Sequence, residues 1–204
     1  MSLVNSLAGL PAKKILPVWS QIRMNGKNYF LAKGLPTRND EAWKYTSVST
    51  LKDASFEFQT THNTTKNLAL LANAWIDQDF TQVVFVDGVF NPELSTDENS
   101  KELEILELQE VLSSKEKSAF LSQFQAARKK AKTIRQDSFE ALNSAHAFSG
   151  IVIRAKKNQA AKKPVQILFL QTQTSQAVYP KIFVIAENGS KLVLLETYAG
   201  VLAL

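Results

Sequence analysis

The chain contains no cysteine among its 204 residues. Disulfide bonds, thiolate nucleophiles and thiolate metal ligands are therefore excluded. Histidine is nearly as scarce, since only His62 and His146 are present. A transition-metal site would have to draw on carboxylates, and no expected helix carries the paired spacing that such sites use. We expect no metal site and no resident cofactor in these residues.

Long apolar runs are also absent. The longest, Leu68 to Ile76 and Val83 to Val86, fall far short of the ~20 residues that cross a bilayer. The N-terminus lacks a basic region followed by an uninterrupted apolar core, because Lys13 and Lys14 interrupt it. We therefore expect no transmembrane helix and a cytoplasmic protein. With 45% hydrophobic residues, the chain has enough apolar side chains to bury a real core.

The sequence carries no catalytic motif: no Walker loop, no Gly-x-Ser-x-Gly, no Gly-x-Gly-x-x-Gly and no His-Glu-x-x-His. The acidic pairs Asp77/Asp79 and Glu104/Glu107 have polar surroundings and are expected to be solvated surface. His146 lies near an expected helix end, which favours a histidine at the edge of the core, bonded to a backbone carbonyl. We expect no catalytic residue.

The net charge of +5 is distributed unevenly, with +5 in residues 1–50, −6 in residues 51–100 and +5 in residues 151–204. The one dense basic run, from Arg128 to Lys132, has no adjoining aromatic residue to stack on bases. Basic residues also suit the C-terminal end of a helix, where the dipole favours positive charge. We therefore expect a solvated helix end there and no nucleic-acid binding.

Helical patterns dominate the start of the chain. After Pro17, apolar residues recur at near-helical spacing, and Asn25-Gly26 predicts a turn between two helical pieces. Gly34 is a suitable C-terminal cap for the second piece. Further helices are predicted at Leu68 to Trp75 and after the capping signals Ser113 to Glu116 and Asp137 to Glu140.

Strand patterns appear in the middle and dominate the end of the chain. The run Val83 to Val86 is apolar on both faces, which predicts a buried strand, and Asp87-Gly88 predicts a hairpin turn after it. Beyond Gly150, strands are predicted at Ile151 to Ile153, Val165 to Leu170, Ile182 to Ala186 and Leu192 to Thr197. Their spacing is irregular, so a sandwich, a barrel and the first coils of a parallel β-helix all remain open.

The most informative stretch is residues 34–46, here called the signature block. The Thr37 hydroxyl is placed to cap a helix whose first turn carries Asp40 and Glu41. Trp43 is then expected to face inward, so that the block is a surface helix held by one buried tryptophan. In full, the block reads Gly34, Leu35, Pro36, Thr37, Arg38, Asn39, Asp40, Glu41, Ala42, Trp43, Lys44, Tyr45 and Thr46.

The signature block resembles the N-terminal signature of the SufB/SufD family, the scaffold components of the Suf iron–sulfur cluster assembly machinery, and SufD most closely. The pattern is Gly-Leu-Pro-Thr-Arg followed by Glu-x-Trp-Lys-Tyr-Thr. Less specific matches follow in the same order, at Val83 to Gly88 with Pro92 and Leu94-Ser95, at Leu142-Asn143 leading into Ile151 to Ile153, at Lys163 to Val165 and at Glu187 to Leu192. Together they cover most of the chain from Gly34 onward.

The resemblance implies an α+β fold. A mixed helical and strand region, residues 1–150, would lead into the first coils of a right-handed parallel β-helix, residues 151–204. The chain ends on an apolar stretch without a terminal cap, so we expect a truncated β-helix and a fragment of roughly the N-terminal half. The signature block is expected to be structural, with Trp43 and Tyr45 packing against the start of the β-helix.

The same resemblance implies a non-catalytic, SufD-like scaffold subunit of the SufBCD complex. Its partners would be a SufB-like scaffold chain and a SufC-like ABC ATPase, with the iron–sulfur cluster handled by the full complex. The absence of cysteine and the form of the block favour SufD over SufB. Two other readings stay open: a stand-alone adaptor that binds proteins through a β-edge near Leu192, and a nucleic-acid-binding module that uses Arg128 to Lys132.

Overall fold

The computed structural model describes residues 2–7, 17–57, 74, 79–96, 101–114, 121–122, 137–146 and 149–200. The chain divides into two compact units, and each unit draws on two separate stretches of sequence. The first unit combines residues 1–57 with 109–147, and the second combines 58–108 with 148–204. The expected domain division at residue 150 stays a prediction.

Two helices form the frame of the first unit. Helix α2 (Pro17–Lys33) begins at a proline, which suits the first helical position because its missing N–H needs no partner there. Helix α7 (Ser138–His146) is capped by Asp137, whose Oδ1 accepts the Glu140 backbone N–H at 2.7 Å, as its capping signal predicts. Shorter elements are α1 (Leu3–Ser6), the 3-10 helix η1 (Glu41–Trp43) and α3 (Thr50–Asp53).

The turn predicted at Asn25-Gly26 is wrong, because α2 runs through both residues. Gly26 lies against α7, where an added Cβ would meet the Ala141 carbonyl oxygen at 2.5 Å. The glycine therefore serves close helix packing and not a change of chain direction. The expected cap at Gly34 is confirmed, since Gly34 has φ +69° and its N–H donates to the Phe30 carbonyl at 2.7 Å.

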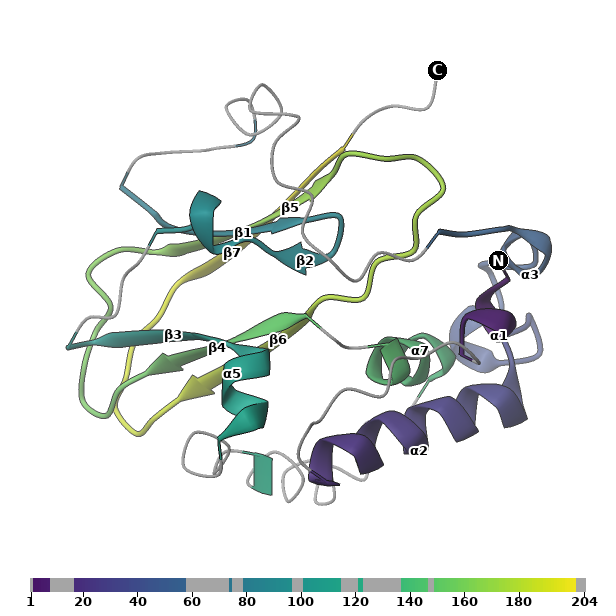
Figure 1. Cartoon of the computed structure of the whole chain (residues 1–204), viewed down its shortest axis with the longest axis horizontal. Coiled ribbons are helices and arrows are strands. Elements are labelled where there is room, and N and C mark those ends of the chain that lie inside the picture. Colours follow the sequence, from purple (N-terminus) through teal and green to yellow (C-terminus); the bar gives the residue numbers. More distant parts are fainter. Residues whose placement is uncertain are drawn as a thin grey trace. The chain divides into compact units, whose positions relative to one another are not determined.

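Two sheets build the second unit (Figure 1). The first has the strand order β2-β1-β5-β7 and the second has the order β3-β4-β6. All neighbouring strands are parallel except the pairs β1–β2 and β3–β4. The strands are β1 (Thr81–Val86), β2 (Val89–Phe90), β3 (Leu103–Glu107), β4 (Gly150–Ala155), β5 (Val165–Gln171), β6 (Lys181–Ala186) and β7 (Leu194–Gly200). The mixed α+β class predicted from the sequence is confirmed.

Strand β1 is buried on both faces, as its unbroken apolar run predicts. Val83 and Phe85 belong to a cluster that also takes residues from β4 and from β3 of the other sheet. Val84 and Val86 face the opposite way and pack with Leu168 and Leu170 of β5. The hairpin predicted at Asp87-Gly88 is also confirmed, with φ values of 49° and 80° and Val86 paired to Val89.

The later strands alternate between the two sheets along the chain. Strand β4 lies in one sheet, β5 in the other, β6 beside β4 and β7 beside β5. The predicted strand at Leu192 to Thr197 is displaced, since β7 is Leu194–Gly200. The helix predicted at 68–75 lies outside the described residues except for Ala74, which is helical, and the capping signal predicted at 113–116 lies mostly outside them. The remaining short elements are η2 (Pro92–Leu94) and α5 (Leu108–Ser113).

Candidate functional site

The signature block is a series of tight turns and not the capped helix that its sequence predicts. The Asp40 carboxylate accepts hydrogen bonds from the Thr37 backbone N–H at 2.8 Å and from the Thr37 hydroxyl at 3.2 Å. Only one 3-10 turn, Glu41–Trp43, follows, and Asp40 makes no side-chain cap bond to it. The predicted capping role of Thr37 is therefore wrong, because Asp40 binds Thr37, three positions earlier, and closes a turn instead.

Trp43 and Tyr45 face different environments. The Trp43 ring is partly buried and lies 5.2 Å from the Phe139 ring of α7, in a tilted arrangement. Tyr45 is 89% exposed, and the Lys44 ammonium lies 5.4 Å from the centre of its ring. Within the first unit Tyr45 therefore packs against little else, and its expected packing against the start of the β-helix stays a prediction. The aromatic partner that the structure gives Trp43 is on a helix of its own unit and not on a strand.

Most of the signature block is surface. Gly34, Leu35 and Pro36 are partly buried, whereas the remaining residues other than Trp43 are exposed. No pair of these side chains forms an acid and base combination around a reactive group in the described structure. The structural role predicted for the block stays a prediction.

A buried polar cluster lies between helices of the first unit. The Ser6 hydroxyl donates to the Leu3 carbonyl at 2.6 Å and lies 2.9 Å from His146 Nε2. Arg23 Nε donates to the Ala145 carbonyl at 3.1 Å. Burial, with the charge of Arg23 as the smaller cause, lowers the pKa of His146 to about 4.

This cluster has the residue types of a serine–histidine pair but not its chemistry. The Ser6 hydroxyl is shared between the Leu3 carbonyl and His146 Nε2, so it is not held for donation to the histidine alone. Both side chains are also more than nine-tenths buried, which leaves a substrate no access. The expected histidine at the edge of the core is thus more deeply placed than predicted, with Ser6 as a partner.

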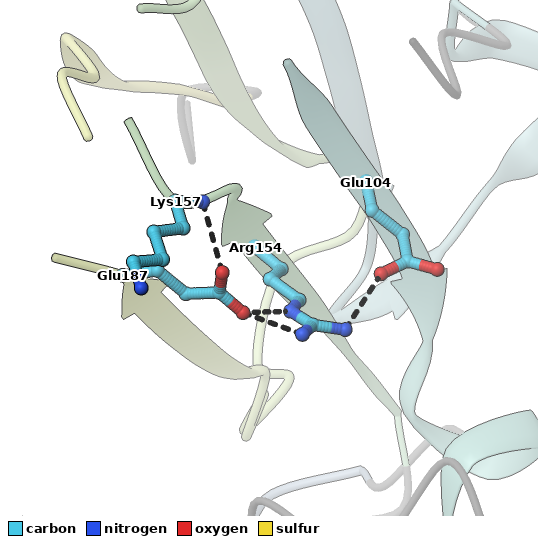
Figure 2. A network of polar contacts seen from close by, with 4 residues as sticks. All are labelled: Glu104, Arg154, Lys157 and Glu187. Atoms are coloured by element: carbon cyan, nitrogen blue, oxygen red, sulfur yellow. Dashed lines mark hydrogen bonds and ion pairs between the residues drawn. The ribbon is translucent and has the colours of Figure 1, made fainter. Parts of the chain in front are cut away.

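An ion-paired network crosses the sheet β3-β4-β6 in the second unit (Figure 2). Arg154 of β4 donates from Nε to Glu187 at 2.7 Å and lies 3.5 Å from Glu104 of β3. The second oxygen of Glu187 accepts the Lys157 backbone N–H at 2.9 Å. The hydrogen bond from Arg154 is the largest cause that lowers the pKa of Glu187. The network joins β3 and β4 to Glu187, the residue directly after β6, and leaves both carboxylates occupied.

The other residues singled out from the sequence that the structure describes form no metal site. Among the described residues, no group of three or more histidines and carboxylates lies close enough to hold a metal ion. Glu104 is bonded to Arg154, as above. His62, Asp77 and the basic run from Arg128 to Lys132 lie outside the described residues.

Three aromatic rings, one on each of the neighbouring strands β1, β5 and β7, stack in a row across their sheet. Phe85 of β1 stacks on Phe169 of β5 at 5.2 Å, and Phe169 stacks on Tyr198 of β7 at 4.7 Å. Phe85 is fully buried, whereas Tyr198 is 71% exposed. Its hydroxyl donates to Glu196 at 2.7 Å, and this bond raises the pKa of Tyr198 to about 12. Apolar surface is thus exposed along β7.

Comparison with known proteins identifies the family. The family model described as the SufBD protein N-terminal region matches residues 2–167 of this chain. The chain belongs to the SufBD family. It is 25% identical over 170 residues to an iron–sulfur cluster assembly SufBD family protein of Synechocystis sp.. That alignment covers 82% of this chain and 36% of the relative, so the chain spans about a third of the relative's length.

The SufBD match includes the signature block, both helices of the first unit and strands β1 to β4. The resemblance seen in the sequence to the SufB/SufD family is therefore confirmed, while the choice between SufB and SufD is not resolved. Among the described residues, no helix is long and apolar enough to cross a membrane.

Sequence reasoning missed two organising residues. Asp40 follows Thr37 by three positions, and this Thr-x-x-Asp spacing is a local signal that could have identified the closed turn. Arg154 offers no local signal, because Glu104 and Glu187 are distant in the sequence and meet it only through strand pairing. Register across a sheet is a tertiary property that periodicity within one strand does not contain.

Proposed function

We propose that this SufBD protein is a non-catalytic, SufD-like scaffold subunit of a SufBCD-type iron–sulfur cluster assembly complex. Its partners would be a SufB-like scaffold chain and a SufC-like ABC ATPase, with the cluster as cargo of the complex. The observation that carries this proposal is the match of the family model to residues 2–167. The name of the Synechocystis relative, which specifies iron–sulfur cluster assembly, supports the same process.

A supporting role is more consistent with the chemistry of this chain than a catalytic one. Cluster iron is usually held by cysteine thiolates, and these 204 residues contain none. Thiolate ligands would therefore have to come from other parts of the assembly. The most prominent charged group, Arg154 with Glu104 and Glu187, is committed to joining strands. The lack of cysteine also favours SufD over SufB as the closer counterpart.

The finer fold proposal is that strands β4 to β7 are the first coils of a right-handed parallel β-helix. Successive strands alternate between the sheets, and equivalent strands of successive circuits pair in parallel, β4 with β6 and β5 with β7. The connecting loops also stack, because Ala160 pairs in parallel with Lys191. This is the connectivity that a β-helix requires, in which each circuit of the chain covers the one before it.

The decisive experiment is to tag this protein in its own cell, purify it gently and identify the bait and its companions by intact mass. The proposal expects a second SufBD-type chain and an ABC-type ATPase in the purified complex. It also expects the tagged protein in the cytoplasmic fraction. A bait that carries neither companion would contradict the scaffold proposal.

A second candidate, a stand-alone protein-binding adaptor, is favoured by one observation. Tyr198 of the edge strand β7 is 71% exposed, and Val193, the residue directly before this strand, is 64% exposed. An exposed apolar edge is a site for strand addition by another protein. In the same purification, a bait ending near Leu204 with other proteins and no ATPase would favour the adaptor.

A further inference from the structure

Two loops of the second unit lie side by side at one end of its sheets. One loop, residues 156–164, connects β4 to β5, and the other, residues 187–193, connects β6 to β7; both curve along the left of Figure 1. Their backbones are hydrogen-bonded to each other: the Asn158 N–H donates to the Asn188 carbonyl at 3.0 Å, and the Ala161 N–H donates to the Lys191 carbonyl at 2.9 Å. The two loops therefore form one continuous surface.

The loop backbone is held in place at the point where the loops touch. Asn158 has φ 56° and Gly189 has φ +73°, so both positions use the left-handed conformation that suits asparagine and glycine. A Cβ on Gly189 would meet Asn158 Oδ1 at 2.4 Å. Because these contacts fix the backbone, the side chains on this surface start from fixed anchor points, and ordering them on binding costs less entropy.

The surface is strongly basic. Residues 154–163 and 187–191 contain six lysine or arginine residues and one carboxylate, Glu187. Arg154 binds that carboxylate and Glu104, and Lys162 lies 3.4 Å from Glu102. The carboxylates at the rim are thus occupied by other groups.

Four exposed lysines lie on the two loops, and one of them, Lys162, is paired with Glu102. Lys157, Lys162, Lys163 and Lys191 are all exposed, and we call these four residues the lysine face. The structure shows no ion pair for the side chains of Lys163 and Lys191 with any other residue that it describes. Positive charge therefore remains uncompensated on the two loops. A surface of this kind attracts an anionic partner.

We propose that the lysine face is a docking surface for an acidic segment of a partner protein. The two loops contain no aromatic residue, so they offer no platform on which nucleic-acid bases could stack. Glu102, Glu104 and Glu187 at the rim also oppose a continuous phosphate backbone, which carries a charge about every 1.7 Å in a duplex. A peptide with spaced carboxylates can avoid them. The assignment of this partner to one of the companion subunits of the assembly rests on the proposed function.

The test uses the full chain and a labelled peptide of alternating glutamate and serine, with binding followed by fluorescence anisotropy. The double variant Lys163→Glu/Lys191→Glu should weaken binding about tenfold or more, and added salt should weaken binding to the unaltered chain. The matched control, Lys33→Glu/Lys52→Glu, changes the net charge equally at two exposed lysines of the other unit. It should change the affinity by less than about twofold. Circular dichroism and the melting temperature verify that both variants are folded.

Three outcomes overturn the proposal. The unaltered chain could fail to bind the peptide, or the two variants could lose affinity equally, which would show an effect of net charge alone. A duplex DNA competitor that binds the lysine face more tightly than the peptide would assign it to nucleic acid instead. Failure here is distinguishable from failure of the proposed function. If the double variant still co-purifies with both companions, the scaffold role is supported and does not need the lysine face. If the unaltered chain binds the peptide but purifies without companions, the lysine face is supported and the scaffold role is contradicted.

Discussion

Gly26 of α2 lies directly against the backbone of Ala141 in α7. A Cβ at position 26 would meet the Ala141 carbonyl oxygen at 2.5 Å and the Ala145 backbone nitrogen at 3.0 Å. Real Cβ atoms do not approach backbone atoms so closely, so the absence of a side chain sets the separation of the two helices. Because the obstacle is backbone, no rotamer change of a neighbouring side chain could relieve the clash.

Gly26→Ala should therefore destabilise the protein, although alanine is normally better than glycine in a helix by about 1 kcal/mol. The helices would have to separate, and we expect a net loss of about 1–3 kcal/mol in the free energy of unfolding. Urea denaturation measures this loss. Asn28→Ala, at an exposed position of the same helix, is the matched control and should change stability by less than about 0.5 kcal/mol. A stabilised Gly26→Ala protein would show that the helices do not pack this closely.

Trp43 and Tyr45 should respond very differently to removal of their side chains. Trp43→Ala loses a partly buried indole and its contact with Phe139, so we expect a loss of about 1–3 kcal/mol. Tyr45→Ala removes a side chain that is 89% exposed and should cost less than about 0.5 kcal/mol. Thermal or urea unfolding of the two variants distinguishes the roles. Equal losses would mean that Tyr45 packs into the fold after all.

Asp87 ties the β1–β2 hairpin to the end of β5. It is almost fully buried, and its carboxylate accepts the Thr172 backbone N–H at 2.7 Å and the Thr172 hydroxyl at 2.6 Å. Asp87→Ala leaves this N–H without its acceptor and places alanine at φ 49°, so we expect a loss of about 2–4 kcal/mol.

Two gentler variants separate the causes of that loss. Asp87→Asn keeps one carbonyl oxygen and a residue that tolerates positive φ, so it should cost about 1 kcal/mol. Thr172→Val removes only the hydroxyl bond and should also cost about 1 kcal/mol. Denaturation of the three variants gives the order of their effects. If Asp87→Ala were no worse than Thr172→Val, the backbone bond and the strained turn would contribute little.

The features that sequence predicted correctly are those with a local cause. The apolar run of β1, the turn at Asp87-Gly88 and the Asp137 cap each depend on residues within a few positions. The features that sequence missed depend on what packs against a residue from elsewhere. Asn25-Gly26 has the composition of a turn, but the approach of α7 decides its conformation.

The signature block shows the same limit for the candidate site. Its sequence indicates the family, but it does not determine which aromatic ring is buried. Trp43 has a partner because α7 brings Phe139 to it, and Tyr45 has no such cover. Residues two positions apart in a series of turns can point in different directions, and sequence alone does not determine which of them meets the core. The role of the block therefore has to be tested by the variants above.

His146 should make the stability of the protein depend on pH. Burial lowers its pKa to about 4 in the folded protein, whereas an unfolded histidine has a pKa of about 6.5. Between these values the unfolded chain binds a proton that the folded protein does not. The contribution of His146 to stability is therefore complete above pH 6.5, is lost progressively as the pH falls towards 4, and changes no further below that.

Urea denaturation at pH 7 and pH 5 measures this effect directly. By the linkage relation, His146 should account for a loss of about 2 kcal/mol in the free energy of unfolding between the two. His146→Gln keeps a polar side chain beside Ser6 but cannot titrate, so its loss between pH 7 and pH 5 should be smaller by that amount. All other titratable groups are present in both proteins, so the comparison isolates His146. An unchanged pH dependence in His146→Gln would mean that His146 titrates normally and that the Ser6 and Arg23 cluster opens to water.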